Sequence, residues 1–331
     1  MALHGNMQSG RANESPQPEK TNIMQTRNVL YAAASLAADA GAGLAVAGGS
    51  KLVDSARESA APRPGPYIES SDGTRLFCKE WGTGKPVLFV HSWAVNSELW
   101  QYQMIHLASQ GMRCIAYDTR GHGRSSDPGR GYDFDTLADD LNAVIQAFDL
   151  RDTAIVGHSI GCSTIVRYLS RYGADRISRA ALLAPTMPFM LKTDDNPEGI
   201  ERSVFEQVRA AFMKDFPKWL GENARPFFVP ETSTEMVNWA VNMCLQSSLK
   251  AIVDLNRVEI ETDFREELKR VRVPTLVIHG DKDHSAPLEL TGRRTALLIP
   301  GCQFKVYEDA PHGLMFTHVD RLNGDLSAFF G

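Results

Sequence analysis

The sequence has few of the features that nucleic-acid-binding and metal-binding proteins carry. Its 35 lysines and arginines are scattered, no basic run exceeds two residues, and aromatic residues do not interleave with basic ones. The five cysteines lie far apart, without a C-x-x-C pair or a cluster of cysteine and histidine, so a zinc site is not expected. The formal net charge of -5 is mild. We therefore expect no nucleic-acid partner, no bound metal and no cofactor.

The first 65 residues differ in composition from the rest of the chain. Residues 1–25 are polar and rich in asparagine, glutamine, serine and proline, a composition typical of disorder. Residues 50–66 contain three prolines and are interpreted as a linker. The remainder is about 265 residues long, enough to bury one large core.

Between these two segments, residues 29–47 form an apolar, alanine-rich run. Arg27 precedes the run and Ala45-Val46-Ala47 ends it, a pattern typical of a secretory signal. Asp39 lies in mid-run and argues against a permanent membrane anchor, because a charge inside a membrane helix costs about 2.5 to 3.5 kcal/mol. We expect an exported protein, periplasmic or secreted; an alanine-rich helix in a cytoplasmic protein is the alternative.

The most informative motif is the G-x-S-x-G at residues 157–161, which is centred on Ser159. It follows an apolar run at 153–156, and the residues after it place apolar side chains at 162, 165, 166 and 169, the spacing of a helix. A strand, a sharp turn and a helix in this order predict a nucleophile elbow. A serine hydroxyl is a poor nucleophile at neutral pH, so a base and an orienting acid are required.

Two aspartates are candidates for the acid. An apolar strand over 271–279 breaks at Gly280 into a loop that carries Asp281 and Asp283. We favour Asp283, because it lies further out on the loop and can reach a neighbouring loop. Asp281 directly follows the glycine, where it is expected to bond backbone amides and fix the turn.

His312 is the predicted base. It follows an alternating strand at 302–307 and lies in the turn Ala310-Pro311-His312-Gly313. His284 is the immediate neighbour of Asp283, so the two side chains are not expected to converge. His318 falls in the last helical stretch and is interpreted as a surface or packing residue. The order serine, acid, histidine is the one that this type of site requires.

An oxyanion hole needs two preorganised amide donors beside the nucleophile. One is expected from Ile160, the residue after the serine, and the other from the loop after the strand at 86–90. That loop reads His91-Ser92-Trp93, so we assign the second donor to the amide of Trp93. The Trp93 indole is then expected to line the substrate pocket.

Together these motifs resemble the α/β-hydrolase fold, and within it the serine esterases grouped with cofactor-independent haloperoxidases and aryl esterases. The resemblance covers residues 66–331 and rests on 91–93, 118–125, 157–161, the loop at Asp283 and 310–313. It implies an α/β fold with a mostly parallel eight-stranded sheet, helices on both faces and a helical cap inserted after strand 6. The core is expected at 66–185 and 271–331, and the cap at 186–270.

Two positions depart from the pattern of these relatives. Ser92 stands in the oxyanion loop where glycine is usual, so the backbone differs there or the hydroxyl adds a donor. Ala94 stands where perhydrolytic members tend to place proline, which lowers the expectation of peroxide chemistry. The segment 118–125 holds an acid, two arginines and His122, but it precedes the nucleophile and is interpreted as structural.

The expected cap is mostly helical, over 200–213 and 234–245, and it carries bulky apolar residues. With Trp93, the side chains expected to face a substrate are Trp219, Phe227, Phe228, Trp239 and Met243, joined by Met187, Phe189 and Met190 after strand 6. Packing within the cap is the alternative for each of them. Because clustered charges are few, the sequence predicts an uncharged, hydrophobic acyl or aryl group.

These features predict a serine esterase that acts on a small-molecule ester through an acyl-enzyme. A carbon-carbon bond hydrolase or a lactonase on the same three residues is the main enzymatic alternative. Acyl transfer to an alcohol or peroxide, and a ligand receptor on a hydrolase scaffold, are the others. Haloalkane and epoxide hydrolysis are disfavoured, because these reactions use an aspartate nucleophile in this fold and Ser159 stands in that place. The sequence leaves a homo-oligomer open.

Overall fold

The computed structural model describes residues 64–331. The predicted disordered segment and export signal fall within residues 1–63, outside the described part. From residue 64 onward, no helix combines the length and hydrophobicity that a membrane crossing requires.

One eight-stranded sheet forms the centre of the described chain, with the strand order β1-β2-β4-β3-β5-β6-β7-β8. Its two antiparallel pairings lie at one edge, between β1 and β2 and between β2 and β4, and every other pairing is parallel. The strands are β1 (Tyr67–Glu69), β2 (Arg75–Trp81), β3 (Pro86–Val90), β4 (Arg113–Tyr117), β5 (Thr153–His158), β6 (Ile177–Leu183), β7 (Thr275–Gly280) and β8 (Gln303–Tyr307). The prediction of a mostly parallel eight-stranded sheet is confirmed.

The central strands are apolar at nearly every position because both faces of the sheet are covered. Side chains alternate between the faces along a strand. In β3, Leu88 joins the hydrophobic cluster on one face and Phe89 joins the cluster on the other. Ile155 and Val156 of β5 divide in the same way. A continuous apolar run therefore serves two cores at once.

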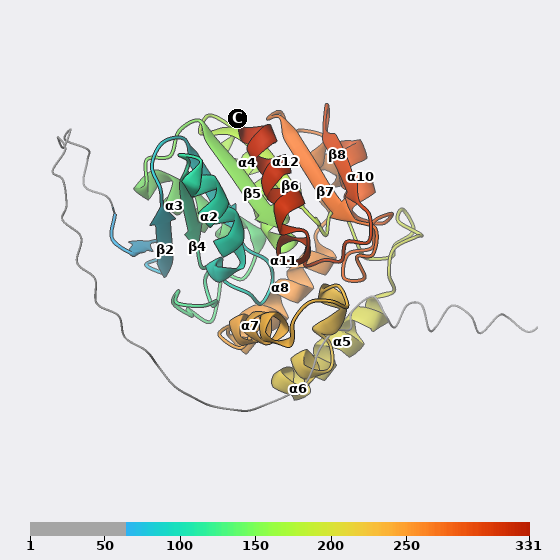
Figure 1. Cartoon of the computed structure of the whole chain (residues 1–331). Coiled ribbons are helices and arrows are strands. Elements are labelled where there is room, and N and C mark those ends of the chain that lie inside the picture. The colour runs from blue at the N-terminus through green and yellow to red at the C-terminus, as the bar shows by residue number, and fades with distance from the viewer. Residues whose placement is uncertain (1–63) are drawn as a thin grey trace, which may run out of the picture.

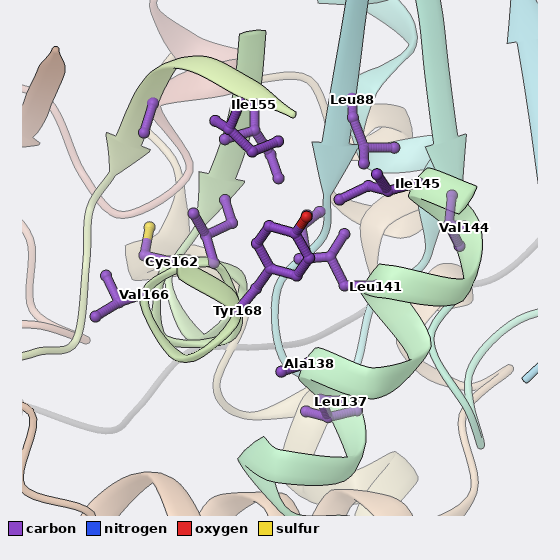
Figure 2. Packing of buried hydrophobic residues seen from close by; sticks show 14 of the residues in the cluster. Leu88, Leu137, Ala138, Leu141, Val144, Ile145, Ile155, Cys162, Val166 and Tyr168 are labelled. Atoms are coloured by element: carbon purple, nitrogen blue, oxygen red, sulfur yellow. The ribbon is translucent and has the colours of Figure 1, made fainter. Parts of the chain in front are cut away.

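Helices cover both faces, as the sequence predicts. α3 (Phe134–Ala147) and α4 (Ile160–Tyr172) pack on one face, where Leu141 and Tyr168 meet the strand residues Leu88 and Ile155 (Figure 2). α2 (Gln101–Ser109) and α12 (Val319–Phe330) contribute to the core of the opposite face. The shorter helices of this layer structure are η2 (Ser97–Trp100), α10 (Gly292–Leu298) and α11 (Leu314–Thr317).

The chain between β6 and β7 is helical, and Figure 1 shows α5, α6, α7 and α8 gathered at one end of the sheet. Its elements are α5 (Arg202–Lys214), α6 (Phe216–Gly221), η3 (Arg225–Phe227), α7 (Thr234–Cys244), α8 (Leu249–Glu261) and α9 (Arg265–Leu268). Phe212, Phe216 and Leu220 form an apolar cluster with Ala94 and Ile252. This cluster joins the helices to the loop after β3.

The segment 118–125 ties loops together. Asp118 accepts hydrogen bonds from the amides of Ser97 and Arg124, both at 2.8 Å. The guanidinium of Arg120 is buried and donates to both carboxylate oxygens of Asp140, at 2.6 and 2.7 Å. The charged side chains of Asp118 and Arg120 therefore hold neighbouring parts of the chain together, which agrees with a structural role for the segment.

Candidate active site

Ser159 occupies a strained backbone conformation at the junction of β5 and α4. Its φ of 54° and ψ of -120° lie in a region that side-chain-bearing residues rarely adopt. The turn is held by the amide of Ser159, which donates to the carbonyl of Leu183 at 2.9 Å. This geometry is that of a nucleophile elbow.

The two flanking glycines are required by close contacts. A Cβ at Gly157 would lie 2.6 Å from Cδ1 of Ile165, inside the helix that follows the serine. A Cβ at Gly161 would lie 2.5 Å from the carbonyl oxygen of Val90 and 2.7 Å from that of His91. Any side chain at either position would therefore push α4 away from the strand and displace Ser159.

Asp283 and His312 form a buried hydrogen-bonded pair. Nδ1 of His312 donates to Oδ2 of Asp283 at 2.6 Å. Oδ1 of Asp283 accepts from the amides of Ser285 at 2.9 Å and Ala286 at 2.8 Å, which fixes the plane of the carboxylate. With Nδ1 donating, the neutral ring presents Nε2 as its acceptor.

The expectation for Asp281 is wrong in one respect. The residue lies at the surface and its carboxylate pairs with Lys282 at 3.2 Å, whereas the loop amides of Ser285 and Ala286 donate to Asp283. The turn is thus fixed by the same carboxylate that holds His312. Asp283 takes this role because it lies on the buried side of the loop, where backbone amides need an acceptor.

The pKa of Asp283 reflects opposing effects. Burial raises it, but the charge interaction with His312 and the hydrogen bonds from His279 and His312 outweigh burial and hold the pKa well below its usual range. The carboxylate therefore stays ionised. It can stabilise a positive charge that develops on His312 when the imidazole takes up a proton.

Two further histidines support the pair, and the sequence reasoning missed both. The N–H at Nε2 of His279 is shared between Oδ2 of Asp283, at 3.1 Å, and the carbonyl of Ala286, at 2.8 Å. Nε2 of His158 donates to the carbonyl of His312 at 3.0 Å. Burial holds the pKa of His158 well below its ordinary value, so the ring is neutral. Each histidine lies inside a motif already singled out, the acid strand and the elbow.

Ser159 and His312 line one cavity of about 200 Å³, together with the predicted oxyanion residues Trp93 and Ile160. Most of the lining is apolar, and Phe205, Val208 and Phe212 of α5 belong to it. The Trp93 indole is fixed by a hydrogen bond from Nε1 to the carbonyl of Ile252 at 2.9 Å. The structure thus brings the predicted nucleophile, base and oxyanion loop to one place.

The expected substrate-facing residues divide into two groups. Trp93, Trp219 and Phe228 line the cavity, as do Met190 and Phe227. Four others are absent from its lining and pack into hydrophobic clusters: Met187, Phe189, Trp239 and Met243. The expectation for these four is therefore wrong.

The helical period of α7 explains why Trp239 and Met243 do not line the cavity. This helix turns Ala240, Val241 and Cys244 toward the cavity, whereas Met243 is buried in the core. Trp239 packs against the rings of Tyr102 and Phe316, at centroid distances of 6.2 and 5.8 Å. Small residues face the cavity here because the bulky ones fill the contact between α7 and the sheet layer.

The two unusual residues of the predicted oxyanion loop, Ser92 and Ala94, have different structural consequences. Ser92 is buried and lines the same cavity as Ser159 and His312. Ala94 has a φ of 62°. A proline ring holds φ near -65°, so this loop cannot accept proline at that position without rebuilding.

A serine at a strained strand-to-helix turn, a buried aspartate–histidine pair and a shared cavity define a hydrolase of the nucleophile-elbow type. The family model described as the alpha/beta hydrolase fold matches residues 85–319, and the chain belongs to that family. Within the family it falls in the haloperoxidase and esterase group. No cluster of histidine, cysteine, aspartate or glutamate able to hold a metal occurs in residues 64–331.

Three relatives illustrate the similarity. The non-heme chloroperoxidase of Kitasatospora aureofaciens is 37% identical over 271 residues, which cover 80% of this chain and 98% of the relative. The bifunctional esterase/perhydrolase of Acinetobacter calcoaceticus is 33% identical over 272 residues, with coverages of 80% and 98%. The solved structure of an esterase from Exiguobacterium antarcticum matches with a TM-score of 0.78 at 28% identity, covering 81% of this chain and 99% of its own.

Proposed function

We propose that the protein is a serine esterase that cleaves carboxylic esters of small, uncharged, hydrophobic substrates through an acyl-enzyme. The observation that carries the proposal is the 2.6 Å hydrogen bond between His312 and Asp283, with His312 and Ser159 lining one cavity. A base held by an ionised acid is what a serine hydroxyl needs to become a nucleophile.

In the proposed reaction, Oγ of Ser159 attacks the ester carbonyl while Nε2 of His312 takes up the hydroxyl proton. The amides of Trp93 and Ile160 stabilise the oxyanion, and Asp283 stabilises the imidazolium. Collapse of the tetrahedral intermediate breaks the ester bond, and His312 returns the proton to the leaving alcohol. Water, activated by His312, then attacks the acyl-enzyme and releases the acid and Ser159.

The size and lining of the cavity support the substrate class. A volume of about 200 Å³ fits a short acyl or a single aryl group. Aromatic residues such as Trp219 and Phe212 provide an apolar contact surface. The esterase activity in the name of the relative from Acinetobacter calcoaceticus points to the same reaction.

Perhydrolysis is the second candidate, because the same relative is named a perhydrolase. Hydrogen peroxide would replace water in the second half-reaction and give a peroxy acid from the same acyl-enzyme. The backbone of Ala94 differs from the proline-bearing loop that perhydrolytic members tend to have, and this favours water as the acceptor.

The test is hydrolysis of p-nitrophenyl esters of increasing acyl length by the wild type and by Ser159→Ala. We expect a burst followed by turnover in the wild type, best for short acyl chains, and neither in the variant. A folded wild-type protein that turns over none of these esters would overturn the proposal in favour of a carbon-carbon bond hydrolase, a lactonase or a receptor. Export remains a prediction, tested by fractionating cells that express the full chain.

A further inference from the structure

Among the described residues, Glu259 is the only acidic one that lines the catalytic cavity. It lies in the last turn of α8, and Asn256, three residues earlier on the same helix face, lines the cavity as well. Thr186, just after β6, lines the cavity beside them. The wall is mostly aromatic and aliphatic, and these three residues form one of its polar regions, in the same cavity as Ser159. The other polar residues of the lining, apart from His312, are Ser92, Asn223 and Ser285.

Only one of the two carboxyl oxygens of Glu259 is hydrogen-bonded within the described chain. Oε1 accepts from the hydroxyl of Ser163 at 3.0 Å and from the hydroxyl of Thr186. Oε2 is buried and has no hydrogen-bond partner among residues 64–331. A carboxylate can accept about four hydrogen bonds, and buried acceptors are rarely left without a donor.

No charged group compensates this carboxyl. Burial raises the pKa of Glu259 to about 7, and the hydrogen bonds of Thr186 and Ser163 counteract the rise in part; no basic side chain in the described chain contributes. A perturbed acid in a catalytic cavity is a candidate for a functional group. A purely structural link between α8 and α4 would need only Oε1 and would leave Oε2 unexplained.

We propose that Glu259 is a specificity-determining residue, whose Oε2 accepts a hydrogen bond from a hydroxyl group on the substrate, away from the ester carbonyl that Ser159 attacks. The inference rests on the proposed esterase function and narrows its substrate class to hydroxyl-bearing acyl or aryl esters. Such substrates are uncharged and largely apolar, and the hydroxyl supplies a donor to Oε2, which has no partner among residues 64–331.

The experiment compares esters that differ by a hydroxyl and a methyl group of similar size. The first pair is p-nitrophenyl 3-hydroxybutyrate and 3-methylbutyrate, and the second is p-nitrophenyl (4-hydroxyphenyl)acetate and (4-methylphenyl)acetate. The measured quantity is the ratio of kcat/KM within a pair, because changes in Ser159 or His312 affect both members alike. We expect the wild type to prefer the hydroxyl ester in at least one pair, by about tenfold or more.

In Glu259→Met the preference is expected to reverse toward the methyl ester, because an apolar side chain replaces the acceptor Oε2. Glu259→Gln retains an acceptor for the hydroxyls of Ser163 and Thr186. It is therefore expected to fold, and it allows the ester comparison even if the methionine variant is unstable. Its preference is expected to shrink, because a neutral amide is a weaker partner than a carboxylate. Ser163→Ala is the matched control, since it removes one bond to Oε1 and leaves Oε2 in place; its ratio should stay close to that of the wild type.

Two results would overturn the inference. One is a wild type that prefers the methyl ester in both pairs. The other is a hydroxyl preference that survives in both Glu259 variants, or that Ser163→Ala abolishes as fully as Glu259→Met. If p-nitrophenyl butyrate is hydrolysed in a Ser159-dependent reaction in these cases, the esterase proposal stands and only the role of Glu259 fails. If no ester is turned over at all, the esterase proposal fails first.

Discussion

Nδ1 of His312 lies 2.6 Å from Oδ2 of Asp283, and Oδ1 of the same carboxylate accepts two backbone amides. The aspartate therefore holds the imidazole and the acid loop at once. An exposed neighbour, Asp281, pairs through its side chain with Lys282 and with no other cation among residues 64–331. Substitutions of Asp283 and Asp281 should therefore differ in their effect on activity.

Asp283→Asn is expected to lower kcat on a p-nitrophenyl ester by about 10⁴-fold, because an amide no longer stabilises the imidazolium and favours the wrong tautomer of His312. Asp281→Asn, the matched control, is expected to stay within about threefold of the wild type, since surface pairs contribute little. Circular dichroism should show that both variants fold. Equal losses of kcat would show that the choice of acid is wrong.

Ser159→Gly is expected to raise the free energy of unfolding by about 1 kcal/mol over Ser159→Ala, because glycine adopts a φ of 54° without steric cost whereas alanine does not. Both variants should be inactive. Urea unfolding of the two variants measures the difference. Identical stabilities would mean that the elbow stores no backbone strain.

Glu259 is expected to make stability depend on pH. Its folded pKa is about 7, raised from 4.5, so the folded state holds the proton more tightly than the unfolded chain does. Its contribution is thus most favourable below pH 4.5 and is lost as the pH rises toward 7 and above. Glutamine does not titrate, so the free energy of unfolding of Glu259→Gln should not fall in this way. Relative to the wild type it should rise by up to about 3 kcal/mol between pH 4.5 and 8. Urea unfolding of both proteins at several pH values in this range tests it, and a difference that does not change with pH would contradict it.

Ala94→Pro is expected to destabilise the protein by about 3 kcal/mol and to lower esterase activity, because proline cannot adopt the φ of 62° and the loop would displace Trp93. Ala94→Gly is the control and should be at least as stable as the wild type. Thermal unfolding and kcat/KM on a short p-nitrophenyl ester measure both effects. If the proline variant keeps full stability, the loop tolerates a second conformation.

Much of the fold could be predicted because its signals are local. The apolar runs of β3 and β5 can be interpreted without knowledge of their partners, since strands buried on both faces are apolar throughout. The elbow around Ser159 is likewise a short-range feature, in which a strand, two glycines and a helical repeat follow one another within residues 153–169. His312 and Asp283 were found from the loops that end two later strands.

The pocket was predicted less well. The sequence predicts that bulky side chains of the inserted helices face the cavity, yet Trp239 and Met243 pack elsewhere and the polar Glu259 lines it. A helix such as α7 has apolar residues on more than one side. Which side meets the cavity depends on how the helix is rotated against its neighbours.

The sequence by itself therefore determined the order of the candidate catalytic groups and the strands that carry them, because each is encoded by neighbouring residues. Only the tertiary structure decided that Oε2 of Glu259 is buried without a partner, that His279 and His158 support the pair, and that small residues of α7 face the cavity. These features arise from contacts between residues as far apart as Ser163 and Glu259. Such contacts are set by the packing of whole helices against the sheet, and no local pattern records them.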